Sequence, residues 1–307
     1  MELSKPNVTP LPTEDEAQEA RRPASLLIAQ FFLFPLIIIG ICVGVFVLFG
    51  YVVHEERSPE SYLNDIQSHP GDGYFERNTR GQAAYGLSNA IVANKERIQK
   101  TDFPEKVLAV YEKSRNDANV RQLLALTLGQ LGEVKAVPAL LEGLGDSPIE
   151  SKINALWALG AIGDNAAVPG VLGVLHHEDP AVRRMAAYVL GAFKDRAAVK
   201  DLAGRDLQVL LEDRQSDVRW NAAMTLAQLG DAGGADVLMQ LLDYDYVEKL
   251  DGLKPEEKAT LRVTAVELLT RLNYEPAREK VAALSQADPD LRVRDASLKA
   301  VESLKKF

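Results

Sequence analysis

The chain has 307 residues, of which 47% are hydrophobic and 26% charged, and its formal net charge is −9 at pH 7. An acidic surface repels phosphate, which argues against nucleic acid as a partner. The single cysteine, Cys42, lies in an apolar stretch, so the remainder of the chain contains no disulfide and no thiolate metal site.

The N-terminal part of the chain consists of a polar tail and an apolar segment. Residues 1–23 contain four prolines and no apolar periodicity, which predicts a disordered tail. Residues 24–53 are predicted to form a transmembrane helix, because the 23 residues from Phe31 to Val53 carry no charge and would extend roughly 34 Å as a helix. Residues 54–57 would then form a juxtamembrane linker. The alternative, a cleaved signal peptide, would have a shorter apolar run.

Basic residues beside the apolar segment predict its orientation. Lys5, Arg21 and Arg22 precede it, whereas only Arg57 follows closely. By the positive-inside rule, the N-terminus lies in the cytoplasm and the large domain outside it, in a single-pass protein of the cell membrane. The reverse orientation stays open, because the difference in charge between the two sides is small.

Two glycines in the apolar segment, Gly40 and Gly44, are four residues apart. Small residues at this spacing let two membrane helices approach closely, so a homodimer through Gly40 and Gly44 is a candidate assembly. Glycine is also common in membrane helices that have no such partner.

Beyond the linker, the sequence repeats. One basic residue recurs in each unit, followed after three positions by a small or apolar residue and after seven by a large aliphatic one. The basic residues are Arg80, Arg121, Lys152, Arg183, Arg219, Arg262 and Arg294. In the fourth unit, Pro169 opens a first helix (helix A), Asp179 and Pro180 interrupt the chain, and a second helix (helix B) begins near Arg183. Residues 58–307 are therefore predicted to form an all-α solenoid of about seven helix pairs.

One stretch of the fourth unit carries a resemblance to a known family. It reads Asp179-Pro180-Ala181-Val182-Arg183, followed by Ala186-Ala187 and Leu190-Gly191. In these residues the chain resembles the HEAT-repeat family, in particular its short bacterial form, the phycobilisome-lyase-type HEAT repeats. The resemblance extends over residues 58–307 and implies an α-solenoid. This family has many functions, so the resemblance implies architecture far more than activity.

Two further features of the repeats have plain structural interpretations. The recurring basic residue can pair with an aspartate of the turn between helices, such as Asp117, Asp179 or Asp217, which would form a ladder of ion pairs along the array. The sixth unit contains an acidic insertion, residues 244–258. This insertion is either a functional loop on one edge of the solenoid or an elongation of two helices.

A helical wheel of helix B separates a core side from an open side. The residues three, seven and ten positions after the basic one face helix A, whereas those one and five positions after it face away. Helix B lines the concave surface in HEAT arrays, so large apolar residues on its open side predict a partner-binding site. The candidates are Tyr85, Leu126, Ile153, Trp157, Tyr188, Trp220 and Met224. The alternative is lateral packing between adjacent B helices.

No pattern in the chain indicates catalysis. Neither a glycine-rich phosphate loop nor a G-x-S-x-G elbow occurs. His176, His177 and Glu178 are adjacent, but the neighbouring units have no matching ligands, so neither a metal nor a cofactor is expected. The sequence contains no candidate catalytic residue, and we expect the protein not to be an enzyme.

These patterns predict a membrane-anchored scaffold or adaptor. It would contact the lipid bilayer through residues 24–53 and bind a partner protein on the concave face of the solenoid. Two alternatives stay open. One is an accessory subunit of a larger membrane complex, and the other is a bilin or cofactor lyase or chaperone, which one branch of the resembled family exemplifies.

Overall fold

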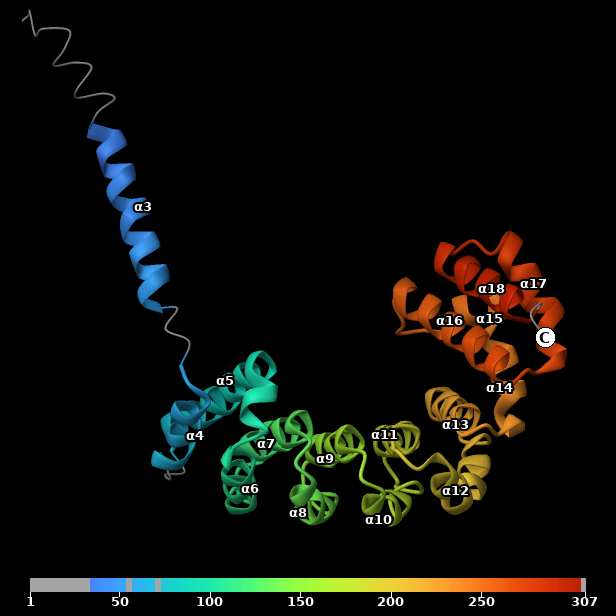
Figure 1. Ribbon diagram of the computed structural model, residues 1–307, viewed down its shortest axis with the longest axis horizontal. Coiled ribbons are helices and arrows are strands. Elements are labelled where there is room, and N and C mark those ends of the chain that lie inside the picture. The colour runs from blue at the N-terminus through green and yellow to red at the C-terminus, as the bar shows by residue number, and fades with distance from the viewer. Residues whose placement is uncertain (1–33, 54–56, 70–72, 305–307) are drawn as a thin grey trace, which may run out of the picture. The chain divides into compact units, whose positions relative to one another are not determined.

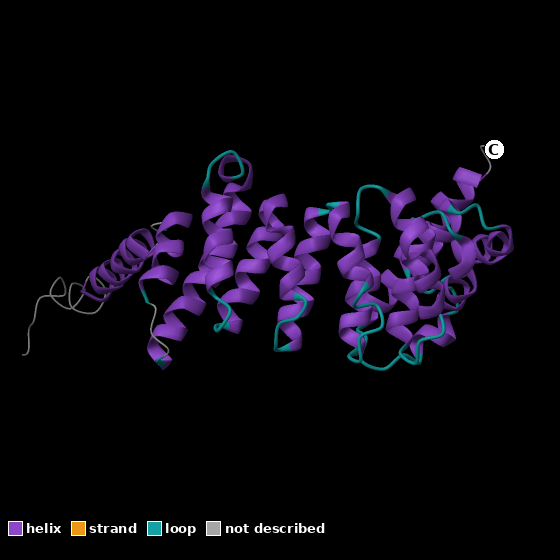
Figure 2. Cartoon of the chain, turned by 90° about the horizontal axis from the view of Figure 1, so that it is seen from below, coloured by secondary structure: helices purple, strands orange, loops and turns teal. Residues whose placement is uncertain are grey.

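The computed structural model describes residues 34–53, 57–69 and 73–304. The chain divides into two compact units, Met1–Glu56 and Arg57–Phe307. Every regular element in the described residues is a helix (Figure 1 and Figure 2). The all-α class predicted from the sequence is confirmed.

The described part of the first unit is helix α3 (Phe34–Val53). Its side chains from Leu36 to Val45 are exposed. A Cβ atom added to Gly40 or Gly44 would meet no atom within 4 Å.

The predicted transmembrane helix is not confirmed. No helix in the described part of the chain combines the length and the apolar character that crossing a membrane requires. The prediction covered residues 24–53, whereas the described helix begins at Phe34, and residues 24–33 lie outside the described residues. The predicted tail, residues 1–23, and most of the linker also lie outside them.

Within its described residues, the second unit is an array of seven helix pairs, as the spacing of the basic residues predicts. The A helices are α4 (Pro59–Ser68), α6 (Phe103–Lys113), α8 (Val137–Gly143), α10 (Val168–Leu172), α12 (Arg196–Leu210), α14 (Ala235–Leu241) and α17 (Arg278–Ala287). The B helices are α5 (Tyr74–Ile98), α7 (Ala118–Leu131), α9 (Ile149–Ile162), α11 (Pro180–Leu190), α13 (Ser216–Gln228), α16 (Pro255–Arg271) and α18 (Leu291–Leu304). Figure 1 shows α7, α9, α11 and α13 in one row and α6, α8, α10 and α12 in a second row beside it.

Several boundaries follow from single residues that the sequence displays. The hydroxyl of Ser58 accepts a hydrogen bond from the backbone N–H of Ser61 at 3.2 Å, which caps α4. Asp179 caps α11 in the same way, accepting from the N–H of Ala181 at 2.8 Å. At the other end of a helix, Gly163 has a φ of 67° and ends α9 in the left-handed conformation that favours glycine.

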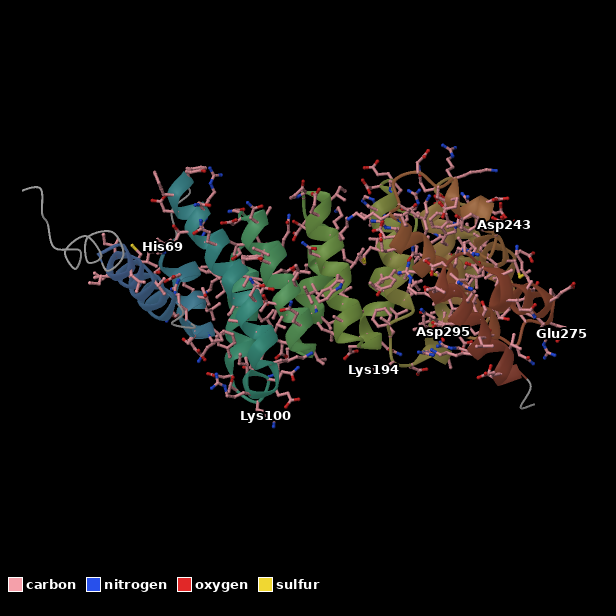
Figure 3. All side chains as sticks on the ribbon, turned by 90° about the horizontal axis from the view of Figure 1, so that it is seen from above. His69, Lys100, Lys194, Asp243, Glu275 and Asp295 are labelled. Atoms are coloured by element: carbon pink, nitrogen blue, oxygen red, sulfur yellow. The ribbon has the colours of Figure 1, made fainter. Side chains whose placement is uncertain are left out.

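The core of the array lies between each A helix and its B helix. The aliphatic residue seven positions after the basic one is buried in the first six units. These residues are Leu87, Leu128, Leu159, Leu190, Leu226 and Leu269. The apolar spacing therefore identified the core side of helix B correctly. The turns between helices lie at the two edges of the array. Lys100 and Lys194, which lie in B-to-A turns, are at one edge, and Asp243, in an A-to-B turn, is at the other (Figure 3).

The insertion in the sixth unit is partly structural. It forms a short helix, α15 (Tyr244–Glu248), whose Val247 side chain is fully buried in the array. The ammonium of Lys258 donates a hydrogen bond to the carbonyl oxygen of Glu248 at 2.6 Å, which connects the two ends of the insertion. At least its first turn is therefore part of the packed solenoid, and Gly252, with a φ of 79°, allows the following bend.

The predicted ladder of ion pairs exists, and most of its contacts connect one unit to the next. The Arg80 Nε donates to Asp117 at 2.9 Å, and the Arg183 Nε donates to Asp213 at 2.7 Å. Two further pairs of this kind are Arg121 with Asp146 and Arg262 with Asp288. In each pair the aspartate comes from the A-to-B turn of the following unit, so the ladder fixes the stacking of consecutive units.

Two aspartates named in the sequence analysis have other roles. Asp179 caps its own helix, and Asp217 pairs with Arg184 at 2.8 Å. The basic residues Lys152 and Arg219 bind backbone carbonyl groups of their own A-to-B turn, those of Leu144 and Asp213, respectively, both at 2.8 Å.

Candidate partner-binding face

The fifth position after each basic residue forms a column of side chains across the B helices. Tyr85 on α5 and Tyr188 on α11 are 62% and 55% exposed, and the other members of the column in the first five units are partly exposed. We call these five residues the B-helix face: Tyr85, Leu126, Trp157, Tyr188 and Met224. In the last two units the column continues with charged, exposed residues, so the apolar stripe ends at α13.

Trp157 belongs both to this face and to the contact between two helices. Its indole is partly buried and packs against the hydrophobic core. A Cβ atom on Gly129 of α7 would lie 3.0 Å from the indole Cζ3, which places the ring over the preceding B helix. Lateral packing therefore accounts for part of the Trp157 surface, and the exposed remainder is available to a ligand.

The first position after the basic residue lies between B helices rather than on the open side. In the second unit, the Gln122 side chain donates a hydrogen bond to Ser151 of the next B helix at 3.2 Å. In the fourth unit, Arg184 at the same position binds Asp217 of the next B helix. Ile153 occupies this position in the third unit, and it is partly buried against the core. Ile153 therefore lies at the junction between helices, and its prediction as a residue of the open face is wrong.

Trp220, also at the first position, is buried and was wrongly assigned to the open face. Only 6% of its surface is exposed, and it belongs to a second hydrophobic cluster together with Val247 of α15 and Val266 of α16. A wheel drawn for one helix cannot reveal this burial, because Val247 and Val266 belong to the sixth unit. Trp220 therefore holds α13 against the C-terminal part of the array.

Three exposed apolar residues of α5 were missed in the sequence analysis. Tyr74, Phe75 and Val92 are 76%, 80% and 68% exposed. The Tyr74 and Phe75 rings contact each other edge to face, with centroids 5.9 Å apart. Tyr74 and Val92 lie eleven residues before and seven residues after Tyr85, spacings that place all three on one side of a helix. That spacing is visible in the sequence, and it extends the B-helix face along α5.

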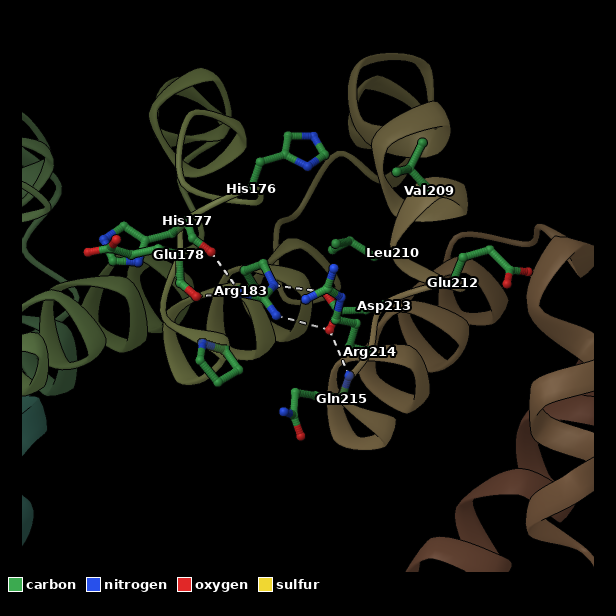
Figure 4. A pocket seen from close by; sticks show the side chains of 11 residues that line it. His176, His177, Glu178, Arg183, Val209, Leu210, Glu212, Asp213, Arg214 and Gln215 are labelled. Atoms are coloured by element: carbon green, nitrogen blue, oxygen red, sulfur yellow. Dashed lines mark hydrogen bonds and ion pairs between the residues drawn. The ribbon is translucent and has the colours of Figure 1, made fainter.

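A pocket lies apart from the B-helix face, where the A-to-B turns of the fourth and fifth units meet (Figure 4). The ion pair of Arg183 and Asp213 forms part of its wall, and Arg183 also donates to the carbonyl oxygen of His177 at 2.8 Å. The hydrogen bond from Arg183 lowers the pKa of the Asp213 carboxyl below its ordinary value and raises the pKa of the guanidinium. These contacts hold two units together.

The two histidines at this pocket contact an aspartate and the backbone. His176 lies 3.6 Å from Asp206, measured from Nε2 to Oδ1. No group of three or more metal-binding side chains occurs in the part of the chain that the structure describes. The Nδ1 of His177 accepts a hydrogen bond from the backbone N–H of Asp179 at 3.0 Å, which shapes the turn before α11.

Comparison with protein families identifies the repeats. Residues 138–206 match the model described as HEAT repeats, and residues 120–146 and 218–244 match the model described as PBS lyase HEAT-like repeats. The chain contains HEAT repeats. The matched segments lie in the central part of the array, from α7 to the beginning of α15, which includes most of the B-helix face. No curated protein matches the chain.

One solved structure shares the fold of these HEAT repeats, and two others are more distantly similar. The complex of CpcE and CpcF of phycocyanin lyase from Nostoc sp. is 20% identical, with a TM-score of 0.50, over 81% of this chain and 95% of that chain. An engineered protein is 18% identical, with a TM-score of 0.44, over 80% of this chain and 96% of that chain. Human deoxyhypusine hydroxylase in complex with glycerol is 16% identical, with a TM-score of 0.34, over 82% of this chain and 86% of that chain. The first likeness shows a common fold, and the other two are too distant to support an argument.

Proposed function

We propose that this chain is a scaffold that binds a partner protein on the B-helix face. The observation that carries the proposal is the exposure of Tyr85 and Tyr188, 62% and 55%, at equivalent positions of two units. Tyrosine supplies a large contact area at a small cost in side-chain entropy and is enriched among the residues that dominate binding energy. Nothing in the packing of α5 or α11 requires an exposed ring at these positions.

The face has the dimensions of an interaction surface. It crosses five B helices, and neighbouring packed helices are about 8–10 Å apart, so the apolar stripe is roughly 40 Å long. An extended or helical segment of a partner matches this shape better than a small molecule does. With a formal net charge of −9 on the chain, a partner whose apolar anchors are flanked by basic residues would associate fastest.

Binding can be tested by pull-down from a mild detergent extract, followed by mass spectrometry. The test variant is Tyr85→Ala/Tyr188→Ala. The matched control is Leu202→Ala/Val209→Ala, which removes two apolar side chains of α12 that are equally exposed, 55% and 57%. A partner that is lost with the tyrosine variant and retained with the control supports the proposal. Equal recovery with all three proteins would show that the B-helix face does not bind it.

We also propose that the N-terminal segment anchors this scaffold in a membrane, with the N-terminus in the cytoplasm. The support is in the sequence: residues 31–53 carry no charge, and Arg21 and Arg22 precede them. Alkaline phosphatase fused to the C-terminus should be active, because it would lie outside the cytoplasm. A stable but inactive fusion retained in the membrane fraction would place the array in the cytoplasm, and recovery in the soluble fraction would refute the anchor.

A second candidate function is a bilin or cofactor lyase or chaperone. It is favoured by the match of residues 120–146 and 218–244 to PBS lyase HEAT-like repeats and by the fold shared with the CpcE and CpcF complex. The exposed rings of Tyr85 and Tyr188 could contact a planar chromophore. Visible absorbance of the purified protein, before and after addition of a bilin, distinguishes this function from the scaffold. An unchanged bilin spectrum at high protein concentration would exclude it.

The remaining alternative is an accessory subunit of a larger membrane complex, and copurification of a stoichiometric complex would distinguish it from an adaptor. If the chain is an accessory subunit, a fixed set of membrane proteins should copurify with it even when Tyr85 and Tyr188 are replaced, because α3 would hold the complex together. An adaptor should lose its partner with the same replacements.

A further inference from the structure

Side-chain amides lie beside the apolar column of the B-helix face. On a helical wheel, the second and ninth positions after the basic residue lie on one side of the fifth position, about 60° and about 40° from it. Four of the first five units have asparagine or glutamine at one or both of these positions. These residues, all at least partly exposed, are Gln82, Asn89, Gln130, Asn154, Asn221 and Gln228.

The amides lie on the side of the column that faces the preceding unit. The Ser88 hydroxyl of α5 donates a hydrogen bond to Oε1 of Gln130 on α7 at 3.4 Å. A Cβ atom on Gly191 of α11 would overlap the side-chain amide of Gln228 on α13. Apolar side chains and amides therefore alternate along the array, with the amide of each helix between its own apolar residue and that of the helix before it.

Several polar groups of this surface are available to a ligand. The side chains of Asn89 and Asn154 and the indole N–H of Trp157 form no hydrogen bond within the residues that the structure describes. A side-chain amide both donates and accepts, so it can bind a carbonyl oxygen and an N–H group of a peptide backbone, whereas the indole donates only. An extended segment leaves its backbone groups free for such contacts, and a helix does not.

The same surface is uncharged, although the chain is acidic. No charged residue occurs at the second, fifth or ninth position of the first five units, and charges at these positions begin in the sixth unit with Glu267 and Arg271. A charged side chain of a partner placed on the B-helix face would lose its water without gaining a counter-charge. The segment that matches this face is therefore uncharged itself.

The spacing of the apolar column selects among peptide conformations. Neighbouring packed helices are about 8–10 Å apart, and each of the first five B helices contributes one apolar side chain. In a polyproline II helix every third side chain points the same way, at intervals of about 9.3 Å. Side chains on one face of a β-strand recur every 6.6–6.8 Å or so, which does not match. An α-helix reaches about 10.5 Å only with every seventh residue, and its backbone offers nothing to the amides.

We propose that the B-helix face binds a polyproline II segment of its partner protein: about 13 residues, uncharged and proline-rich, with an apolar residue at every third position. The apolar residues contact the five side chains of the B-helix face. The backbone carbonyl groups between them accept hydrogen bonds from the indole of Trp157 and from amides such as Asn154. This inference rests on the scaffold function proposed above and defines the partner of the same surface.

Three labelled synthetic peptides test the conformation of the segment, with binding to the full chain in mild detergent measured by fluorescence anisotropy. The first has leucine at every third position and proline elsewhere, over about 15 residues. The second has the same composition with leucine at every second position, and the third is a helical alanine–glutamine peptide with leucine at every seventh. The first should bind at least about tenfold more tightly than the other two, and Tyr85→Ala/Tyr188→Ala should weaken its binding at least about tenfold. Equal binding of the first two peptides, preference for the helical one, or no binding of the first would overturn the proposal.

Removal of amides tests recognition of the backbone. Asn89→Ala/Asn154→Ala should weaken binding of the first peptide at least about fivefold, because backbone groups of the peptide lose their partners. The matched control, Gln208→Ala/Gln286→Ala, removes two exposed amides of the A helices α12 and α17 and should leave binding unchanged. Circular dichroism checks that each variant remains helical. Unchanged affinity in a folded Asn89→Ala/Asn154→Ala variant would contradict the proposed backbone contacts.

The pull-down described above keeps the two proposals apart, because it does not depend on the conformation of the bound segment. A partner that is lost with the tyrosine variant, together with a first peptide that does not bind, would retain the scaffold function and reject the polyproline II segment. A first peptide that binds and is displaced by the tyrosine replacements would support both.

Discussion

Gly129 of α7 and Ala158 of α9 touch where two consecutive B helices cross: a Cβ atom on Gly129 would lie 2.7 Å from the Cα of Ala158. That distance is too short for any side chain, so the glycine sets how closely the two helices approach. Gly160 of α9 repeats the contact one unit later, against Val189 at 2.9 Å.

Gly129→Ala should therefore destabilise the array by about 1–3 kcal/mol, because the two backbones must separate. Gly204→Ala is the matched control. Gly204 lies inside α12, and a Cβ atom there meets nothing within 4 Å, so alanine should stabilise its helix by roughly 0.5–1 kcal/mol. Urea unfolding followed by circular dichroism measures both. A stabilising Gly129→Ala would show that the helices can separate freely.

Residues 58–307 should fold without the N-terminal segment. The array has its own hydrophobic clusters, and in repeat proteins stability comes from each unit and its contacts with neighbouring units. The purified fragment should show strong helical circular dichroism and a cooperative thermal transition. A soluble fragment without helical signal would mean that residues before Ser58 belong to the core.

Trp220→Ala should cost about 3–5 kcal/mol, as expected for a large buried aromatic residue. Tyr188→Ala should change the free energy of unfolding by no more than about 0.5 kcal/mol, because more than half of its surface is exposed. Partner binding should respond in the opposite order. Equal losses of stability in the two variants would mean that Tyr188 is covered in solution and would remove it from the B-helix face.

Asp288→Ala should be among the most damaging single substitutions in the array. Its carboxylate pairs with Arg262, and the two side chains are only 1% and 3% exposed, so the variant leaves a buried guanidinium without its counter-charge at a cost of about 3–5 kcal/mol. Glu142→Ala breaks the pair with Arg115, whose side chains are 59% and 63% exposed, and should leave the melting temperature unchanged. Thermal melts at one pH compare the two.

Acid should weaken the ladder at Asp213. Arg183 lowers the pKa of this carboxyl in the folded state, so the folded protein binds a proton less readily than the unfolded chain does. The stability that this pair contributes is present above the ordinary aspartate pKa of about 3.9 and is lost as the pH falls through the lower folded-state value. Asp213→Asn should be less stable than wild type at pH 7, and the difference should shrink towards pH 3. A constant difference across this range would mean that the charge of Asp213 is unimportant.

Which residues lie exposed on the B-helix face could be predicted in part. Tyr85 and Tyr188 lie on the exposed side of helix B as the five-residue offset indicated, because that side has no neighbour within its own unit. Ile153 and Trp220 were misplaced, because the one-residue offset turns toward the following unit. A helical wheel contains no information about that neighbour. Tyr74 and Val92 stand at helical spacing from Tyr85 in the sequence and are exposed. Neither lies five positions after a basic residue, so the column of candidate residues did not include them.

The sequence by itself determined the units: their number, the helix pair in each, and the leucine that fills each of the first six pairs. These follow from local rules of periodicity, capping and proline placement, which act within about ten residues. Only the tertiary structure decided what lies between units. The Asp213 carboxylate pairs with Arg183 rather than with Arg219, and the absence of a side chain at Gly129 lets Ala158 approach closely. Such contacts depend on the rise and rotation from one unit to the next, which many weak packing interactions set together and no single residue encodes.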